Sequence, residues 1–442
     1  MTTPDRPRIA IVGTGISGLA AAWALDQTAE IVVYEAANRI GGHSATVDVT
    51  IAGETIPVDT GFIVYNTLNY PNLTGLFDHL GVATEKSDMS FGVSIDDGRT
   101  EWAGSDAIWK VFAQPTNLFD ARFLLMLKDV FRFNRQAVAD RHAGRLEGLS
   151  LGAYLEREGY RGRFVSDYLV PMGAAIWSTP VDRMLDFPAE SFVAFFDNHR
   201  LLGFDRPVWR TVTGGSRAYV EKLSAPFAGK IRLGSAVTSV AREAGGLRLV
   251  DASGAVEHYD RVVFACHAPQ AHAALDGASL PIQKHWSGAF QTLPNDVFLH
   301  SDASLMPRRR AAWSSWNYLA RRGEGGTGAV ALTYWMNLLQ NIDRSKPLFV
   351  SLNPPRAPAA NTVHGRFRYD HPQFDRAAFD GQKALPEIQG RDGVHFAGAW
   401  TGHGFHEDGL RSGIAVAEAL GARYPWRVPL SALDARPLAE AA

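Results

Sequence analysis

Three glycines near the N-terminus have the spacing of a phosphate-binding turn. Gly13, Gly15 and Gly18 follow an apolar run at residues 9–12, whose β-branched side chains are typical of a buried parallel strand. Gly13 permits a tight turn, Gly15 lets the backbone approach a pyrophosphate, and Gly18 lets the following helix pack against the sheet. We expect this helix to span Ile16–Leu25 and to present its positive N-terminal end to the phosphates.

An acidic residue completes the pattern. Glu35 ends a second apolar run at residues 31–34 and lies 17 residues beyond Gly18, near the roughly 20 expected of the acid that binds a ribose hydroxyl. A carboxylate at this position favours a free 2′-hydroxyl over a 2′-phosphate. These residues therefore predict a dinucleotide site.

The glycine pattern alone is weak evidence, because it occurs a second time. Gly323, Gly325 and Gly328 have the same spacing, but two arginines precede them in place of a strand. A β-rich run at residues 329–335 follows them in place of a helix. We interpret this second occurrence as a hairpin loop.

Composition narrows the class of protein. A chain of 442 residues suggests about two domains or one elaborate domain, and its net charge of −2 gives no indication of nucleic-acid binding. The single cysteine, Cys266, excludes a disulfide framework and multi-cysteine metal sites, which suits a reducing cytosol. We find no signal peptide and no apolar stretch of the roughly 20 residues that a membrane span needs. We therefore expect a cytoplasmic protein without a metal site.

The order of the elements predicts two interleaved domains in an α/β fold. We expect a Rossmann-like dinucleotide-binding domain formed by residues 1–90, 205–270 and 390–427. A mixed α+β substrate domain would be formed by residues 91–204 and 271–389. The three separated segments of the first domain imply that the chain leaves it and returns twice.

Local patterns predict the individual elements. Residues 119–135 have apolar side chains at near-helical spacing, Leu124 and Phe131 among them. The final β–turn–helix unit is expected to consist of a strand at residues 394–398, a glycine-rich loop and a helix at residues 412–420. Three short strands are expected between these regions, at residues 237–241, 247–251 and 261–265.

The residues after Glu35 add a resemblance to a known group of proteins. With the Arg-Ile-Gly-Gly run at residues 39–42, the N-terminus resembles the flavin-containing amine oxidase and phytoene desaturase superfamily. The Thr-Gly-Gly turn at residues 213–215, residues 237–266 and residues 396–413 resemble three further segments of that superfamily. The resemblance implies FAD as the cofactor. The flavin is expected to be non-covalent, because the one cysteine lies far from the region where many amine oxidases attach it.

The resemblance also implies which residues bind FAD. Gly13, Gly15 and Gly18 would hold the pyrophosphate. Glu35 would hold the adenosine ribose, and Arg39 would present guanidinium donors nearby. The remaining FAD-binding positions that it implies are Ser17, Gly41, Gly42, His43, Gly61, Phe62, Ile63, Val237, Gly398, Ala399, Gly409, Leu410 and Ser412. Many relatives place an acid where this chain has Ala399, so the binding of the ribityl hydroxyls stays open.

Catalysis by a flavin needs few protein groups, because the cofactor carries the redox chemistry. The candidates are His403, His406 and Glu407, in the glycine-rich loop expected to face the flavin. A histidine near neutral pKa can move a proton, and so can an acid whose pKa an apolar pocket raises. Glu407 and Asp408 have an alternative role at the N-terminus of the last helix, and the histidines an alternative role in packing.

A narrower resemblance covers nearly the whole chain. Residues 58–64, 88–91 and 404–410 resemble a bacterial branch of predicted NAD/FAD-binding oxidoreductases. That branch is associated with enzymes that modify unsaturated acyl chains of membrane lipids. The resemblance implies a hydrophobic small molecule or a membrane-lipid acyl chain as partner, with peripheral contact at the inner membrane face. Two basic stretches, at residues 308–310 and 122–135, are interpreted as solvated surface.

Three functions follow from these observations. The first is an FAD-dependent oxidoreductase that dehydrogenates an unsaturated fatty acyl chain. The second is a flavin amine oxidase, although no tyrosine occurs between Trp400 and Gly413, where true amine oxidases place part of an aromatic cage. The third is a non-redox lipid-binding or escort protein on the same fold, which would have no use for a phosphate-binding turn.

Overall fold

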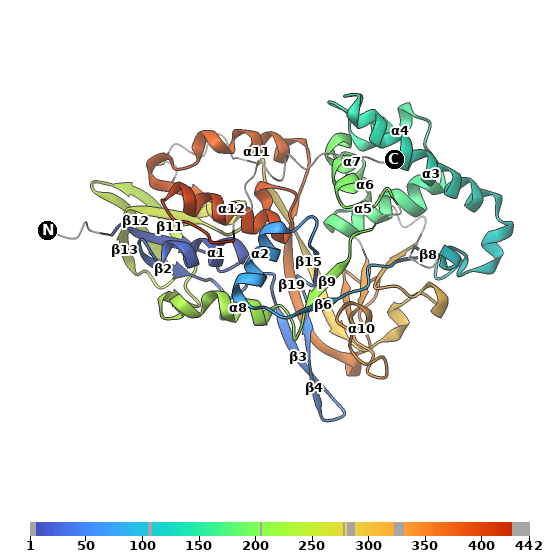
Figure 1. Cartoon of the computed structure of the whole chain (residues 1–442), viewed down its shortest axis with the longest axis horizontal. Coiled ribbons are helices and arrows are strands. Elements are labelled where there is room, and N and C mark those ends of the chain that lie inside the picture. The colour runs from blue at the N-terminus through green and yellow to red at the C-terminus, as the bar shows by residue number, and fades with distance from the viewer. Residues whose placement is uncertain are drawn as a thin grey trace.

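A parallel sheet of five strands forms the centre of one half of the molecule, on the left of Figure 1. The computed structural model describes residues 6–104, 108–203, 206–276, 279–280, 288–321 and 331–426, so the second glycine pattern lies outside the described residues. The strands run in the order β10 (Ile231–Arg232), β2 (Glu30–Tyr34), β1 (Arg8–Val12), β14 (Arg261–Phe264) and β20 (Val394–Phe396). They come from three separate segments of the chain, and the expected α/β, Rossmann-like fold is confirmed.

The strand order reverses beside β1. The chain passes from β1 through α1 (Ile16–Leu25) to β2 on one side, while β14 pairs with β1 on the other side. In open parallel sheets, ligands bind at such a switch point, outside the carboxyl ends of the strands. The turn after β1 and the turn after β14 meet at this edge. The expected bounds of α1 are confirmed.

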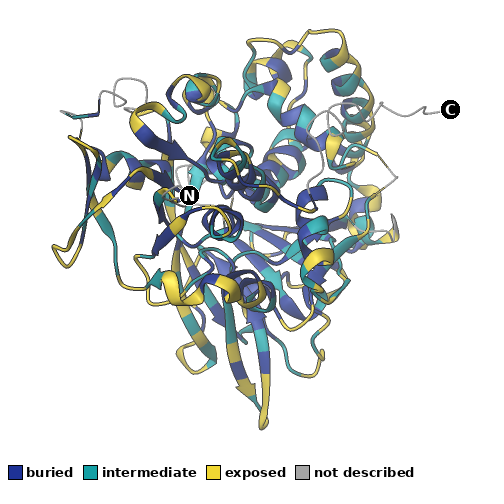
Figure 2. Cartoon of the chain, turned by 60° about the vertical axis from the view of Figure 1, so that its left-hand side comes forward, coloured by how far each residue is buried: buried dark blue, intermediate teal, exposed yellow. Residues whose placement is uncertain are grey.

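Both faces of the parallel sheet are covered. An antiparallel sheet covers one face together with α9 (Ala268–Ala274) and α11 (Arg376–Ile388). Its strands are β11 (Val237–Glu243), β12 (Gly246–Asp251) and β13 (Val256–Tyr259). On the other face, α1 packs with α2 (Pro71–Leu80), α8 (Arg217–Ser224) and α12 (His406–Ala419). Figure 2 shows the resulting buried centre in dark blue.

The other half combines a seven-stranded sheet with a helical layer, on the right of Figure 1. The strand order is β19 (Val363–Gln373), β15 (Gln291–His300), β18 (Phe349–Leu352), β17 (Leu332–Trp335), β16 (Trp316–Ala320), β7 (Phe91–Ile95) and β8 (Thr100–Gly104). The helices are α3 (Ala121–His142), α4 (Leu151–Arg157), α5 (Val170–Trp177), α6 (Val181–Met184) and α7 (Ala189–Asn198), with the short α10 (Met336–Leu339) at the opposite side. One large apolar core joins the helices to the sheet.

Two small sheets connect the halves. β3 (Thr46–Ile51) and β4 (Glu54–Asp59) form a hairpin whose exposed tip projects downward in Figures 1 and 2. β5 (Val64–Asn66), β9 (Trp209–Val212) and β6 (Thr84–Lys86) form the second sheet, in that order. Within the described part of the chain, no helix is long and apolar enough to cross a membrane.

The helix expected at residues 119–135 is present as α3, whereas the expected start of the last helix was wrong. The last helix begins at His406, six residues before the expected residue 412, because the Asp408 carboxylate accepts a hydrogen bond from the Phe405 N–H and caps it. Leu124 and Phe131 do not belong to the buried face of α3. Their exposed fractions are 43% and 61%, since α3 packs through other positions of the helix.

Candidate cofactor and active site

The three glycines of the turn after β1 meet different steric requirements. Gly13 has a φ of +106°, and a Cβ there would lie 2.7 Å from the Ala265 carbonyl oxygen. A Cβ on Gly18 would lie 2.0 Å from the Gly13 oxygen, so this position must be glycine for close packing. A Cβ on Gly15 would meet no atom within 4 Å. The turn therefore leaves open space only above Gly15, where a phosphate group fits.

Two helices present their N-terminal ends to the same place. A Cβ on Gly409 would lie 2.9 Å from Cγ2 of Ile16, and a Cβ on Gly413 would lie 2.2 Å from the Ser17 oxygen. Small residues thus let α12 pack directly on the start of α1. Gly15 is the N-cap of α1 and no side chain caps its first turn. The uncapped first turn of α1 and the positive dipole ends favour an anionic diphosphate here.

Glu35 lies beside this turn with capacity to accept another hydrogen bond. Its Oε2 accepts from the backbone N–H of Thr14 at 3.0 Å and from the Thr14 hydroxyl. Its Oε1 accepts from the Ala37 N–H at 2.8 Å. Since a carboxylate oxygen accepts two hydrogen bonds, Oε1 remains able to accept one from a ribose hydroxyl.

The segment after Arg39 runs against the glycine turn. Arg39 donates from Nη2 to the Gly42 carbonyl oxygen at 2.7 Å, which fixes the loop. Gly41 and Gly42 have φ values of +104° and +57°, and a Cβ on Gly42 would lie 3.0 Å from the Gly15 Cα. Both glycines are therefore needed for the loop to reach the turn.

His43 follows this loop and is half-buried. Its Nε2 atom has no hydrogen-bond partner among the described residues. Burial, with the positive charge of neighbouring groups, holds the pKa of His43 well below its ordinary value. Gly61 packs so closely that a Cβ would lie 2.2 Å from the His43 oxygen, and the Phe62 N–H donates to the same oxygen at 2.8 Å. This packing brings the predicted segments 41–43 and 61–63 together.

Around His43 the structure places polar residues that sequence patterns did not indicate. The ring of His43 lies 5.5 Å from that of His371 and 5.8 Å from that of His267. Asn295 lies 2.8 Å from His371 Nδ1, and burial lowers the pKa of His371 to about 4. His267 could have been expected, because it follows β14 at the same sheet edge as Gly13. No local pattern marks His371 or Asn295.

The C-terminal glycine turn is held by its own side chains. The Ser412 hydroxyl accepts from the Gly398 N–H at 2.8 Å, with Ala399 next in the turn and Leu410 buried below it. The Trp400 indole donates to the Cys266 oxygen at 3.0 Å. Burial raises the pKa of the Cys266 thiol to about 12, so it is not a reactive thiolate.

His406 lies at the start of α12 within a hydrogen-bonded group. Its ring stacks on Phe62 with centroids 3.8 Å apart, and its Nε2 lies 2.6 Å from the Tyr219 hydroxyl and 3.3 Å from the Ser44 hydroxyl. Burial lowers the pKa of His406 to about 3, so the imidazole is neutral at ordinary pH. These contacts fix the position of the His406 ring. Its catalytic role stays a prediction.

The two acids after His406 both accept hydrogen bonds from helix N-termini. Glu407 accepts from the backbone N–H groups of Asn72 and Leu73 at 2.9 Å and from the Asn72 side chain at 2.8 Å, at the start of α2. Burial raises its pKa. Asp408 accepts from the His403 and Phe405 N–H groups and from Arg411.

We expect Glu407→Ala to cost about 2–4 kcal/mol of unfolding free energy, because it leaves three buried donors without their acceptor. Urea denaturation measures this loss. Glu407→Gln keeps one acceptor oxygen and should lose less. If the alanine variant were as stable as the parent chain yet no longer reduced its flavin, an acid–base role would replace the capping role.

His403 lies among aromatic side chains. The Trp177 indole donates to the His403 oxygen at 3.2 Å, and the Phe379 ring lies 6.0 Å from that of His403. Phe195 stacks on Phe405 at 4.8 Å. The Nδ1 atom of His403 is buried and has no hydrogen-bond partner among the described residues. This side of the glycine-rich loop is therefore apolar.

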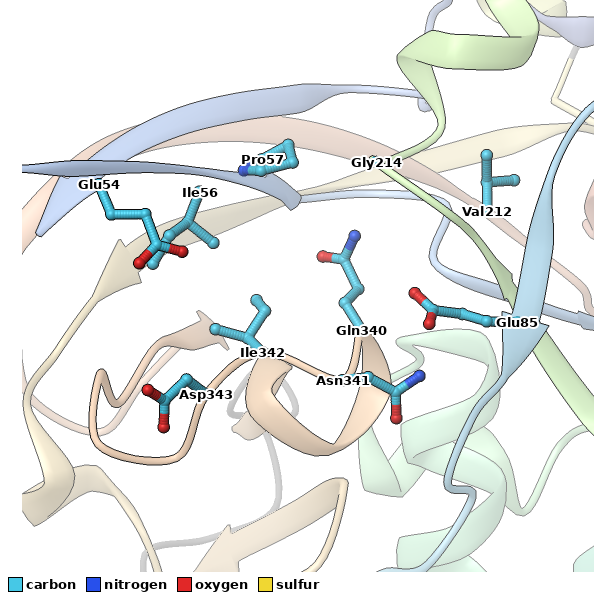
Figure 3. A pocket seen from close by; sticks show the side chains of 10 residues that line it. All are labelled: Glu54, Ile56, Pro57, Glu85, Val212, Gly214, Gln340, Asn341, Ile342 and Asp343. Carbon is cyan, nitrogen blue, oxygen red and sulfur yellow. The ribbon is translucent and has the colours of Figure 1, made fainter.

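Val237 begins β11, two residues after Ser235, whose N–H donates to the Glu35 carbonyl oxygen at 2.8 Å, and its contact with FAD stays a prediction. The pocket of Figure 3 is lined by none of the residues predicted to bind FAD. The pocket measures about 180 Å³, and Gln340 points into it while its amide accepts from the Asp59 N–H at 2.9 Å. Glu54, Glu85 and Asp343 line it and no cation does, so it does not suit a dinucleotide phosphate.

Within the described ranges no group of histidine, cysteine or acidic residues is arranged to hold a metal.

The open space above Gly15, the paired helix ends and the unpartnered His43 Nε2 fit a bound FAD. The fold and site thus define a dinucleotide-binding flavoprotein. The chain belongs to the flavin-containing amine oxidoreductase family, whose model matches residues 16–421. It is an FAD-dependent oxidoreductase, and the non-covalent attachment of its FAD stays a prediction.

Solved structures share this fold across the whole chain. Cyclohexylamine oxidase from Brevibacterium oxydans IH-35A has 18% identity and a TM-score of 0.67, covering 95% of this chain and 100% of that one. A CLA-producing fatty acid isomerase from P. acnes has 15% identity and a TM-score of 0.65, covering 95% and 99%. Wild-type putrescine oxidase bound to putrescine has 16% identity and a TM-score of 0.64, covering 94% and 99%. No curated protein matches the sequence.

Proposed function

We propose that this enzyme dehydrogenates an unsaturated fatty acyl chain of a membrane lipid. The observation that carries the proposal is the aromatic lining of the loop at residues 403–405, where Trp177, Phe195 and Phe379 lie. FAD would supply the redox chemistry when bound, because it accepts two electrons and two protons as the substrate gains a double bond. The aromatic side chains would exclude water and contact the apolar chain.

The same loop offers little to a substrate that carries a positive charge. A protonated amine would need a carboxylate or an exposed aromatic face, and the carboxylates nearest the loop belong to Glu407 and Asp408. Each of these already accepts three hydrogen bonds or more from its own surroundings. One structural neighbour is named as a fatty acid isomerase, so this fold also occurs in a protein named for such a substrate.

An anaerobic titration tests the proposal. The purified yellow protein is mixed with phospholipids that carry unsaturated chains, with saturated phospholipids of equal length, and with a panel of amines. We expect only the unsaturated lipids to bleach the flavin absorbance, and air or another acceptor to restore it. Bleaching by amines but not by lipids would overturn the proposal in favour of amine oxidation.

A further inference from the structure

Large exposed apolar side chains gather on one part of the surface. Of the nine in the described residues, six lie between residues 109 and 131. This stretch therefore carries more exposed apolar side chains than the rest of the described surface. We call this group the α3 patch. It consists of Trp109, Leu118, Phe119, Leu124, Leu125 and Phe131, with exposed fractions from 43% for Leu124 to 90% for Phe119.

The patch lies on the outward face of α3 and the turns before it, at the far right of the molecule in Figure 1. α3 buries Phe123, Met126 and Phe133 in the core. Leu124, Leu125 and Lys128 fall on the other side of the helix and are exposed. Leu124 and Leu125 thus lie on a second apolar face of the helix, away from the core.

The charges around the patch are positive. Lys110, Arg122, Lys128 and Arg135 lie beside it, and none forms an ion pair with a carboxylate of the described residues. Among the described acids of residues 108–135, Asp120 pairs with Arg163 at 2.8 Å and Asp129 pairs with Arg132 at 3.6 Å. The patch therefore combines apolar side chains with uncompensated positive charge.

A basin of about 800 Å³ opens next to Phe119. Arg99, Arg122 and Arg163 line it, together with Thr100, Gln114 and the Asp120 carboxylate, which Arg163 pairs at 2.8 Å. Arg99 and Arg122 therefore leave the basin with excess positive charge. Guanidinium groups bind phosphate oxygens through paired hydrogen bonds, so the basin suits a phosphate headgroup beside an apolar surface.

We propose that the α3 patch docks this protein on an anionic lipid bilayer, with a lipid phosphate in the basin of Arg99 and Arg122. Exposed aromatic and leucine side chains flanked by about 4–8 cations are typical of an interfacial lipid-binding surface. A two-fold contact between copies of the chain would bring the same cations together, which disfavours a dimer here. The run at residues 308–310 is not this surface, since Arg309 bonds the buried Glu101 at 2.9 Å.

Vesicle sedimentation with the FAD-loaded protein tests the proposal without turnover. We expect binding to phosphatidylcholine vesicles that contain phosphatidylglycerol, weak binding to phosphatidylcholine alone, and loss of binding at high salt. The double variant Arg122→Glu/Lys128→Glu should weaken binding about tenfold or more. Phe119→Ser/Leu125→Ser should also weaken it, without changing thermal unfolding or flavin absorbance, because both side chains are exposed.

The matched control reverses two exposed cations on α11, in the other half of the molecule: Arg376→Glu/Lys383→Glu. Equal effects of the α3 and α11 variants, or no binding of the parent protein, would overturn the proposal. A change in oligomeric state on altering the patch would assign it to a second copy instead. Flavin bleaching by unsaturated lipid without vesicle binding would reject the docking surface and leave the proposed function intact.

Discussion

Replacing Gly15 with alanine should give a folded protein that purifies with less than about a tenth of the flavin of the parent chain. Gly15 has φ −65° and ψ 176°, which alanine adopts without strain, and its added Cβ meets no atom within 4 Å. The methyl group costs the fold little, but it occupies the space next to the α1 N-terminus that a phosphate needs. Flavin absorbance per protein measures the loss, and FAD titration measures the affinity.

The neighbouring glycine provides the matched control. Gly18→Ala places a Cβ 2.0 Å from the Gly13 oxygen and 3.2 Å from the Ala265 Cβ, so backbone must move. We expect this variant to lose about 1–3 kcal/mol or more of unfolding free energy, in addition to flavin. Full flavin content in Gly15→Ala would show that the cofactor does not lie against this turn.

The glycine turn could be predicted from the sequence because its contacts are local. The Gly18 contact with Gly13 spans five residues, and Glu35 lies one strand further on. Each requirement is therefore visible as a residue type at a fixed spacing. The bounds of α1 followed for the same reason, since its start is the end of that turn.

The polar groups around the flavin segments could not be predicted in this way. Glu407 contacts Asn72 across 335 residues, and His406 contacts Tyr219 across 187. Asn295 meets His371 only because β15 and β19 pair. Such contacts depend on how strands and helices assemble, and no spacing in the sequence records them. The role of Glu407 at the start of α2 is an example, since the sequence placed it only at its own helix.

Lowering the pH from 7 to 5 should destabilise the protein by several kcal/mol. Burial lowers the pKa of five histidines in the folded state to about 4 or about 3; they are His199, His300, His371, His395 and His406. In the unfolded chain the ordinary pKa is about 6.5, so below that pH the unfolded state binds more protons. Stability is therefore full above pH 6.5 and falls with pH, by about 2 kcal/mol per histidine at pH 5.

Two buried acids, Asp59 and Glu407, oppose this trend, because burial raises the pKa of each. Burial raises the pKa of Asp59 to about 6, so its folded form takes up a proton before the unfolded form does. Its contribution rises as the pH falls from 6 towards 4, and offsets only about 1 kcal/mol at pH 5. The histidines therefore dominate, and the net loss approaches the 5–15 kcal/mol that typically stabilise a domain.

Urea denaturation at intervals between pH 8 and pH 5, with and without added FAD, measures the slope. His300→Asn is the informative variant, because His300 bonds Ser351 at 2.8 Å and accepts from the Asp302 N–H, away from the flavin segments. It should flatten the pH dependence by one histidine's share and leave the flavin content unchanged. A parent protein whose unfolding free energy changes by less than about 1 kcal/mol over this range would contradict the neutral, buried state of these histidines. His371 and His406 border the flavin segments, whereas His300 does not. Comparing the series with and without FAD therefore distinguishes release of the cofactor at low pH from unfolding of the protein at low pH.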